Sequence, residues 1–411
     1  MPRNKSLHNT KSDSRFTGIS FWMLVMSFAL FFSPKSYAVP SSIFYAWRLS
    51  QSIVSAIAVL LYLRRDKISL RWTMFMLFLF TYYLLSTFIK NSGGSYRAAV
   101  YQFASVGGFV TLLEYGLRRD RDTCLDALLT AGILMCGVHF YTFLRYRRLP
   151  LGMRSTSLDL VGELTRHPWF FLTHDNGSAF YFIPMIGGLW YRAMSRQKGM
   201  LEALLFSVLT LYMYWSLNTV TAKYATTFLV LSLFYVAKFG VSGPFSKSSY
   251  RTALLIGVSL CIIVISFYAN EVFTQLASSL GKSSDMGRGR IWQRVWPLFW
   301  NSPLIGSGFE EDSTIIFKLG INHCHNIIVQ ILYTGGITAM ILSAASLLQC
   351  DVAPNTRKKQ PIAAQVALQL TIIALFVCAT FDWYLYMPIQ FLPFFLYHYT
   401  DSLDAEICAE F

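Results

Sequence analysis

The sequence predicts an all-α, polytopic integral membrane protein. Three observations support this class: the hydrophobic content, the length of the apolar blocks and the placement of the charges. Of the 411 residues, 54% are hydrophobic and 14% are charged. The apolar residues form blocks of roughly 17 to 23, which is the length that crosses about 30 Å of hydrocarbon as a helix. We therefore expect about twelve membrane-spanning helices, at 17–34, 42–63, 72–89, 98–116, 125–144, 168–190, 200–217, 224–237, 252–268, 325–348, 362–381 and 384–399.

The first apolar block has two interpretations, a cleaved signal peptide and a first transmembrane helix. It follows a basic stretch and ends near the sequence SYAVP, as either would. In a protein with many spans the first one directs targeting and is normally retained. We favour the retained helix.

Charge placement predicts the orientation of the chain. The net charge is +14, and Lys and Arg gather on alternate segments between the spans, which places the N-terminus in the cytoplasm. Two outward segments, 145–166 and 282–318, are also rich in Lys and Arg. A protein with only a structural role would not need Lys and Arg in its outer loops, so we expect these segments to contact anionic ligands. Nucleic acid is not an expected partner, because the chain has no soluble basic domain, zinc spacing or aromatic RNA-binding signature.

The expected spans divide the chain into three parts. Residues 1–268 hold nine transmembrane helices with short loops, residues 269–324 form one large outer loop between spans nine and ten, and residues 325–411 hold the last three helices and a cytoplasmic tail. We expect the working surface to lie in the outer loops, because no soluble part is long enough to fold alone.

Within the large loop, the sequence IWQRVWPLFW predicts an amphipathic helix at the membrane interface. Its tryptophans stand four residues apart and are expected at the level of the lipid headgroups: Trp292, Trp296 and Trp300. The sequence Asn-Ser-Pro at 301–303 should end this helix, and Gly306 and Gly308 should supply a flexible turn after it.

Two histidines, His323 and His325, are the candidates for acid–base chemistry. A neutral imidazole can take a proton from a hydroxyl if a partner orients its second nitrogen, and either Asn326 or a loop carboxylate could do so. A structural role and a metal site are the alternatives. No third ligand with metal spacing is evident, since residues 310–312 resemble a solvated acidic turn, so neither a metal nor a cofactor is expected.

Four cations of the outer segments are candidate phosphate ligands. A guanidinium can grip two phosphate oxygens at once, although the same side chains could instead serve as interfacial anchors. The candidates are Arg288, Arg290, Arg294 and Lys223.

Several short motifs follow one another between residues 287 and 336. They are Gly287-Arg288 with Trp292 four residues on, the Asn-x-Pro-x-x-Gly-x-Gly sequence at 301–308, and His325-Asn326 followed by Gly335-Gly336. In this order the chain resembles the O-antigen ligase/polymerase superfamily of bacterial inner-membrane glycosyltransferases. The motifs cover about fifty residues, and the span count and the large outer loop extend the likeness along the chain. The ligase pattern has nine residues between His-Asn and a glycine, and a small or polar residue three positions after that glycine; here Gly336 fits the glycine, and Ala339 takes the last place.

The resemblance implies a GT-C-like membrane fold, a metal-independent glycosyltransferase and an active site facing the periplasm. The implied donor is an undecaprenyl-diphosphate-linked glycan. His325 would be the general base, with His323 the other candidate, and Arg288 would contact the diphosphate. A family arginine is replaced here by Lys223, which cannot make the bidentate contact.

The family has two branches. The ligase transfers the glycan to a lipid A–core sugar in lipopolysaccharide biosynthesis, and the polymerase transfers it to another lipid-linked glycan. The ligase is favoured, because the second basic segment offers contacts for a polyanionic acceptor: Arg145, Arg147, Arg148 and Arg154. A transporter or flippase of lipid-linked oligosaccharides is the rival from another class, but no repeated halves are evident in the sequence.

Overall fold

The computed structural model describes most of the helical chain. The described residues are 18–34, 39–65, 68–90, 96–146, 155–159, 162–166, 175–217, 221–242, 288–310, 312–320, 323–347, 362–381 and 387–397, with scattered positions between 250 and 275 and at Leu385. These residues form twelve α-helices, a π-helical turn and a 3-10 turn. The predicted helical class is therefore confirmed.

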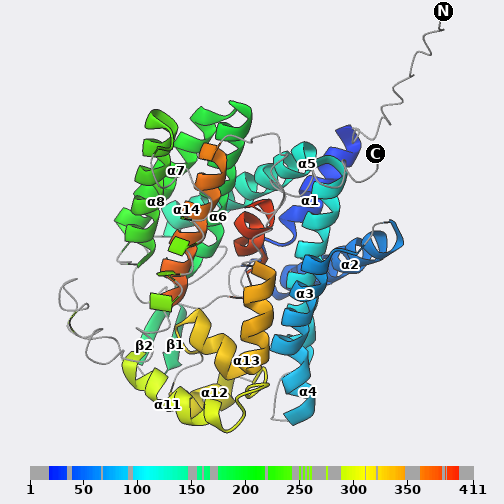
Figure 1. Cartoon of the computed structure of the whole chain (residues 1–411), viewed down its shortest axis with the longest axis vertical. Helices are drawn as coiled ribbons and strands as arrows, with labels where there is room; N and C mark the ends of the chain where they lie inside the picture. Colours follow the sequence, from blue (N-terminus) through cyan, green and yellow to red (C-terminus); the bar gives the residue numbers. More distant parts are fainter. Residues whose placement is uncertain are drawn as a thin grey trace, which may run out of the picture.

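One element of the described residues departs from the all-α prediction. Strands β1 (Ser155–Asp159) and β2 (Gly162–Arg166) pair antiparallel, with Ser155 opposite Arg166. They lie toward the same end of the molecule as the yellow helices α11 and α12 (Figure 1). A two-stranded hairpin thus occupies the outer loop that was expected between the fifth and sixth spans.

Helix α6 (Asp175–Arg196) forms the centre of the bundle. Its apolar side chains are fully enclosed, including Ile183, Ile186 and Leu189. Helices α7 (Met200–Ser216), α8 (Thr221–Phe239) and α14 (Ile362–Phe381) surround it (Figure 1). A helix that is apolar on every side is stable only when other helices or lipid cover it, and here helices do so.

Helix α5 (Tyr96–Tyr146) contains two of the predicted spans, 98–116 and 125–144, in one continuous element. Its backbone leaves the helical region at Asp120, where φ is −153° and ψ is 90°. The Asp120 carboxylate accepts hydrogen bonds from the backbone N–H and the hydroxyl of Thr123, at 3.1 and 2.7 Å, and so caps the second half. The predicted inner loop is thus reduced to a kink.

Five helices of the described residues are long and apolar enough to cross a membrane, which indicates a multi-pass membrane protein. They are Ser41–Arg64, Leu70–Ile89, Tyr96–Arg145, Ile327–Ser346 and Ile362–Thr380. Shorter apolar helices match other predicted spans, at Ser20–Ala29, Met200–Ser216 and Pro388–Tyr397. The predicted span 252–268 lies outside the continuously described segments. The count of twelve spans stays a prediction.

Side-chain contacts identify two opposite ends of the bundle. Helices α3 (Leu70–Leu79), η1 (Phe80–Leu85) and α4 (Ser86–Lys90) follow one another along one path. At the start of this path Ser69 donates to Glu114 of α5, close to the kink. At its other end Thr87 meets the loop that follows α11. We call these the kink end and the loop end.

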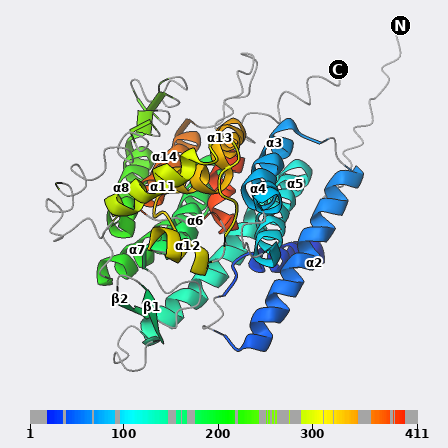
Figure 2. The same ribbon diagram turned by 90° about the horizontal axis from the view of Figure 1, so that it is seen from below.

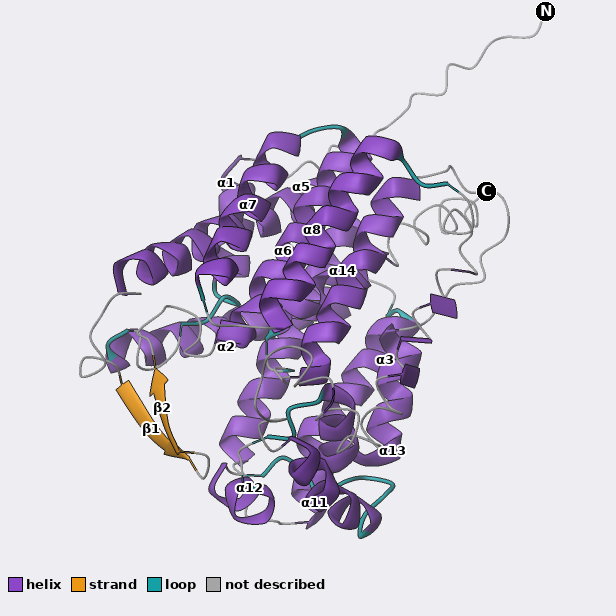
Figure 3. Cartoon of the chain, turned by 90° about the vertical axis from the view of Figure 1, so that its left-hand side faces the viewer, coloured by secondary structure: helices purple, strands orange, loops and turns teal. Residues whose placement is uncertain are grey.

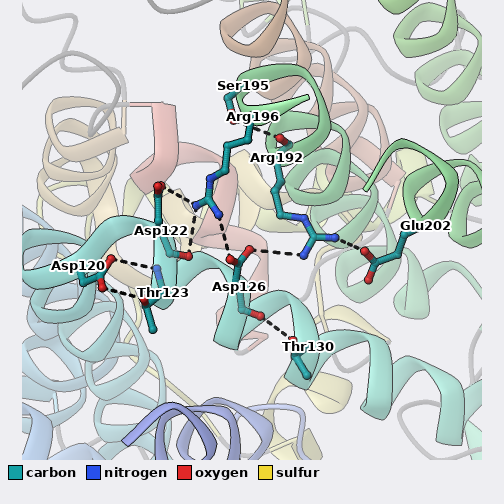
Figure 4. Close-up of polar contacts among 9 residues, drawn as sticks. All are labelled: Asp120, Asp122, Thr123, Asp126, Thr130, Arg192, Ser195, Arg196 and Glu202. Atoms are coloured by element: carbon teal, nitrogen blue, oxygen red, sulfur yellow. Dashed lines mark hydrogen bonds and ion pairs between the residues drawn. The ribbon is translucent and has the colours of Figure 1, made fainter. Parts of the chain in front are cut away.

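Predicted inner segments meet at the kink end. Arg196, at the end of α6, contacts Asp122 and Asp126 beside the α5 kink, at 2.7 and 2.9 Å (Figure 4). The alternation of segments predicted from the charges is therefore consistent with the fold. Which end faces the cytoplasm stays a prediction.

The loop end carries a second, smaller core. Helices α11 (Arg288–Trp300) and α12 (Asp312–Leu319) lie there, and α11 runs beside α13 (Ile327–Leu347), as Figures 2 and 3 show. Apolar side chains from all three meet in one buried cluster, which includes Val295, Ile315 and Val329. This cluster holds the segment with the two histidines in place.

Candidate functional site

Helix α11 is amphipathic, as predicted, and its apolar face packs on α12 and α13. Ile291 and Val295 are buried in the small core, and Gln293 is exposed. Trp292 is buried as well, and its indole N–H donates to the carbonyl of Cys324 at 2.7 Å. The expectation of three headgroup-level tryptophans is therefore wrong for Trp292, because a protein acceptor lies within its reach. Trp300 is exposed.

Helical geometry separates the three arginines of α11. Arg288 lies three and four residues before the buried Ile291 and Trp292, so its backbone position falls on the stripe that faces α13. Arg290 lies three and four residues before the exposed Gln293 and Arg294, and falls on the opposite stripe. Arg294 donates to the carbonyl of Leu319 at 3.2 Å, which satisfies the last turn of α12. One arginine of three thus lies on the inner stripe.

The two histidines lie side by side at the start of α13. Their ring centroids are 3.9 Å apart, with an interplanar angle of 56°. The backbone N–H of His325 donates to Nδ1 of His323, at 3.2 Å. His325 has a φ of +49°, in the left-handed region that few residues with a side chain adopt. Both side chains are partly buried and partly accessible.

Asn326 caps α13. Its side-chain oxygen accepts the backbone N–H groups of Ile328 and Val329, at 3.0 and 3.1 Å, and the side chain is buried. Asn326, one of the two expected partners of the His325 ring, thus uses its side-chain oxygen to cap the helix. A sequence signal for this role exists, because Asn is a preferred residue immediately before a helix.

Side chains hold both the backbone N–H and the backbone carbonyl of Cys324. Its N–H donates to the side-chain oxygen of Gln330 at 2.8 Å, and its carbonyl accepts from Trp292. Burial raises the pKa of the Cys324 thiol, so the thiolate that nucleophilic chemistry needs is not favoured. The residues before and after His325 are therefore held by side chains of α11 and α13.

The loop after α11 docks into a break in α13. Gly336 has a φ of +68° and a ψ of −168°, which interrupts the helix. The loop fills the break with backbone hydrogen bonds: Ser307 N–H to the Tyr333 carbonyl at 2.7 Å, Gly308 N–H to Thr334 at 2.9 Å, Ile337 N–H to Pro303 at 2.8 Å and Thr338 N–H to Leu304 at 3.1 Å. Irregular backbone within an apolar bundle is stable only when its polar groups are satisfied in this way.

Two glycines make this close docking possible. A Cβ on Gly336 would lie 2.4 Å from the carbonyl carbon and oxygen of Leu304, and a Cβ on Gly306 would lie 2.5 Å from those of Thr334. Gly306 and Gly308 are buried, with positive φ angles. Helix α4 holds the same loop from the other side, where Phe309 N–H donates to the Thr87 hydroxyl at 2.8 Å. The expected flexible turn is thus a fixed one.

Glu310 corrects a second expectation from the sequence. It was expected in a solvated acidic turn, but its side chain is 1% exposed. The carboxylate accepts from the ammonium of Lys318 on α12 and, at 2.7 Å, from the hydroxyl of Tyr333 on α13. These partners lie eight and twenty-three residues away in the chain, so no short-range pattern in the sequence indicated them.

The remaining predicted ligands lie elsewhere or outside the described residues. The ammonium of Lys223 lies 4.9 Å from the ring centre of Trp215, at the corner between α7 and α8. Arg145 is exposed at the end of α5 and donates to the hydroxyl of Tyr141 at 3.1 Å. Three side chains predicted to bind the acceptor lie outside the described residues: Arg147, Arg148 and Arg154.

The described residues contain no group of three or more His, Cys, Asp and Glu side chains arranged to hold a metal ion. The chemical groups that the structure brings together are two imidazoles, a capped helix start and the inner stripe of α11. Two adjacent imidazoles are groups that can transfer a proton.

Comparison with protein families finds a match to part of this chain. Residues 180–344 match the family model Wzy_C, described as O-Antigen ligase. The match covers less than half of the chain and includes most of the central helix α6, helices α11 and α12, and α13 as far as residue 344. It confirms the resemblance drawn from the motifs between 287 and 336. It also indicates sugar transfer of the O-antigen ligase/polymerase type in lipopolysaccharide synthesis. A search of curated proteins found no match.

Proposed function

We propose that this chain is an O-antigen ligase of the bacterial inner membrane. It transfers a glycan from undecaprenyl diphosphate to a sugar hydroxyl of lipid A–core on the periplasmic face. It is a glycosyltransferase with a GT-C-like fold that needs no metal or other cofactor. The observation that carries the proposal is the fixed position of His325 at the capped start of α13, beside α11 and within the matched residues 180–344.

His325 acts as the general base. It removes the proton of the acceptor hydroxyl, and that oxygen attacks the anomeric carbon of the donor sugar. A new glycosidic bond forms as the bond from the sugar to the diphosphate breaks. Undecaprenyl diphosphate leaves with the bonding electrons, and the proton passes from His325 to water. The energy comes from the sugar–diphosphate bond, so no nucleotide is required.

Arg288 stabilises the leaving diphosphate. Its position on the inner stripe of α11 supports this role, because Trp292, one turn along the same stripe, bonds to the residue next to His325. A guanidinium offers paired donors to phosphate oxygens, and its charge opposes the charge that develops on the leaving group. Arg290 and Arg294 lie on the other stripe, and we assign them no direct role in this step.

The acceptor assignment rests on charge. A ligase must hold a polyprenyl donor and a phosphorylated glycolipid acceptor at the same time, and the outward basic segment that begins at Arg145 is a second site for an anion. Lys223 is assigned to neither substrate, since its ammonium lies over Trp215.

The first test is transfer by purified protein, with donor and lipid A–core supplied in detergent. His325→Ala should lower the initial rate by about 10² to 10⁴-fold, the range for loss of an acid–base group. The wild-type rate should not change when a chelator is added. The variant must keep the elution volume and thermal transition of the wild type. Normal transfer by a folded His325→Ala protein would show that the base is another group.

A second test separates the two branches of the family. Deletion of the gene should leave polymerised glycan on undecaprenyl diphosphate and lipid A–core without a cap. The opposite pattern, with single repeat units attached to the core, would show intact ligation and lost polymerisation. The function would then be that of a polymerase using the same donor.

A further inference from the structure

His323 contacts His325 in two ways, through the ring of His325 and through its backbone. The Nδ1 atom of His323 accepts the N–H of His325 at 3.2 Å. A ring nitrogen that accepts a hydrogen bond carries no proton, so the neutral His323 ring must carry its hydrogen on Nε2. The hydrogen bond therefore selects one tautomer of His323 and uses one of its two nitrogens.

The accepted N–H belongs to a residue in an uncommon conformation. His325 has a φ of +49°, and a non-glycine residue remains in this region only when its surroundings hold it there. The surrounding peptide groups are held in turn: Gln330 and Trp292 bind the N–H and carbonyl of Cys324, and the carbonyl of Asn326 accepts from Gln330 N–H at 2.9 Å. His323 holds the peptide N–H between these two fixed points.

We propose that His323 is a positioning residue for His325. Through Nδ1 it holds the His325 backbone in the left-handed conformation, and this conformation directs the His325 imidazole toward the acceptor hydroxyl. The inference rests on the proposed role of His325 as the base. It assigns His323 a function through Nδ1, which differs from that of a second base or a substrate ligand acting through Nε2.

Two substitutions of His323 distinguish the roles of its Nδ1 and Nε2 atoms, because each keeps a polar group near only one of them. In His323→Asn the side-chain oxygen replaces Nδ1, and Asn commonly accepts the N–H two residues further along the chain. In His323→Gln the terminal amide lies near the former Nε2 position, and no acceptor remains at the Nδ1 position. We expect the Asn variant to keep kcat within about twofold. The Gln variant and His323→Ala should lose about 10 to 100-fold in kcat with little change in KM, as expected when a catalytic group is misplaced.

The same assay shows which idea fails. A Gln variant that is active beside an inactive Asn variant would assign the role to Nε2 and overturn the proposal. Wild-type rates in all three variants, or equal loss in all three with unchanged thermal transitions, would overturn it as well. The His325→Ala variant is measured in parallel. If it still transfers glycan, His325 is not the base and the proposed function fails at that point. If it loses transfer while all His323 variants keep the wild-type rate, only the positioning role of His323 is overturned.

Discussion

The two ends of the helical bundle use arginine differently. At the kink end, Arg196 contacts Asp122 and Asp126, and Arg192 contacts Asp126 and Glu202 (Figure 4). At the loop end, Arg294 donates to a backbone carbonyl and Arg288 lies on the inner stripe of α11. Carboxylates of the protein thus compensate the first pair of arginines, which join α5, α6 and α7. At the loop end, by contrast, Arg294 bonds to a backbone carbonyl, and Arg288 is the arginine that we propose to meet an anion from outside the fold.

The comparison also extends to the backbone. At the kink end, α5 leaves helical geometry at one residue, and the Asp120 side chain satisfies the next turn. At the loop end, α13 is interrupted and a separate segment bonds to both sides of the break. The kink depends on local contacts, whereas the break depends on residues about thirty positions earlier. A substitution that adds even one methyl group should therefore lower the free energy of unfolding more at the loop end than at the kink end.

The largest expected effect on stability is at the break in α13. Gly336→Ala places a Cβ 2.4 Å from Leu304 at a positive φ, so the loop cannot dock without moving. We expect the free energy of unfolding to fall by about 3 kcal/mol, with loss of transfer, because strain and lost backbone hydrogen bonds add. Thermal unfolding in detergent measures the change.

Gly137→Ala in α5 is the matched control. A Cβ there would meet nothing within 4 Å, and alanine favours a helix by up to about 1 kcal/mol. The control should be neutral or slightly stabilising. If both variants behave alike, the docked loop does not contribute to stability as described.

The next effect concerns activity at the loop end. Arg288→Ala should lower the transfer rate by about 10² to 10³-fold, as does the loss of a group that stabilises developing charge. Arg288→Lys should lose nearly as much, because lysine cannot contact two oxygens at once. Arg290→Ala, from the opposite stripe of the same helix, should change the rate less than about threefold. Recovery of most activity by Arg288→Lys would reduce the role to general electrostatics.

The smallest effect is expected at the kink end. Arg196→Ala should lower the free energy of unfolding by about 1 kcal/mol, since its partner Asp126 is 40% exposed and solvent screens the pair. The transfer rate per folded molecule should not change. A double-mutant cycle with Asp126→Ala isolates the pairwise contribution. A fall in kcat in Arg196→Ala would contradict the division of roles between the two ends.

Much of the helical framework could be predicted from the sequence. The predicted spans 42–63 and 362–381 correspond to α2 (Ser41–Arg65) and α14 (Ile362–Phe381). Long apolar runs form helices in a membrane because every backbone group must be bonded within its own segment. The continuity of α5 was not predicted, since two separate spans joined by an inner loop were expected. The sequence RRDRDT between them contains neither glycine nor proline, and the helix only bends there, at Asp120.

Prediction was less successful where distant residues meet. The structure shows Glu310 enclosed between Lys318 and Tyr333, and Trp292 bonded to the Cys324 carbonyl. Both residues were expected near solvent or headgroups, because charge and aromatic spacing report only local surroundings. The hairpin of β1 and β2 was also missed, since its short polar strands lack the apolar alternation that marks a half-buried strand.

The membrane class, most helix positions, the family resemblance and the two candidate histidines could all be inferred without the fold. These properties depend on composition and on residues close together in the chain. The fold was needed to show that the stripe of α11 carrying Arg288 is the buried one, that Gly306 and Gly336 permit backbone contact, and that the ring of His323 accepts a hydrogen bond from the backbone of His325. The first two depend on how segments far apart in the chain pack together, and packing is set by the shapes of all the neighbours at once. The third depends on the left-handed backbone of His325, beside a peptide group that Trp292 and Gln330 hold.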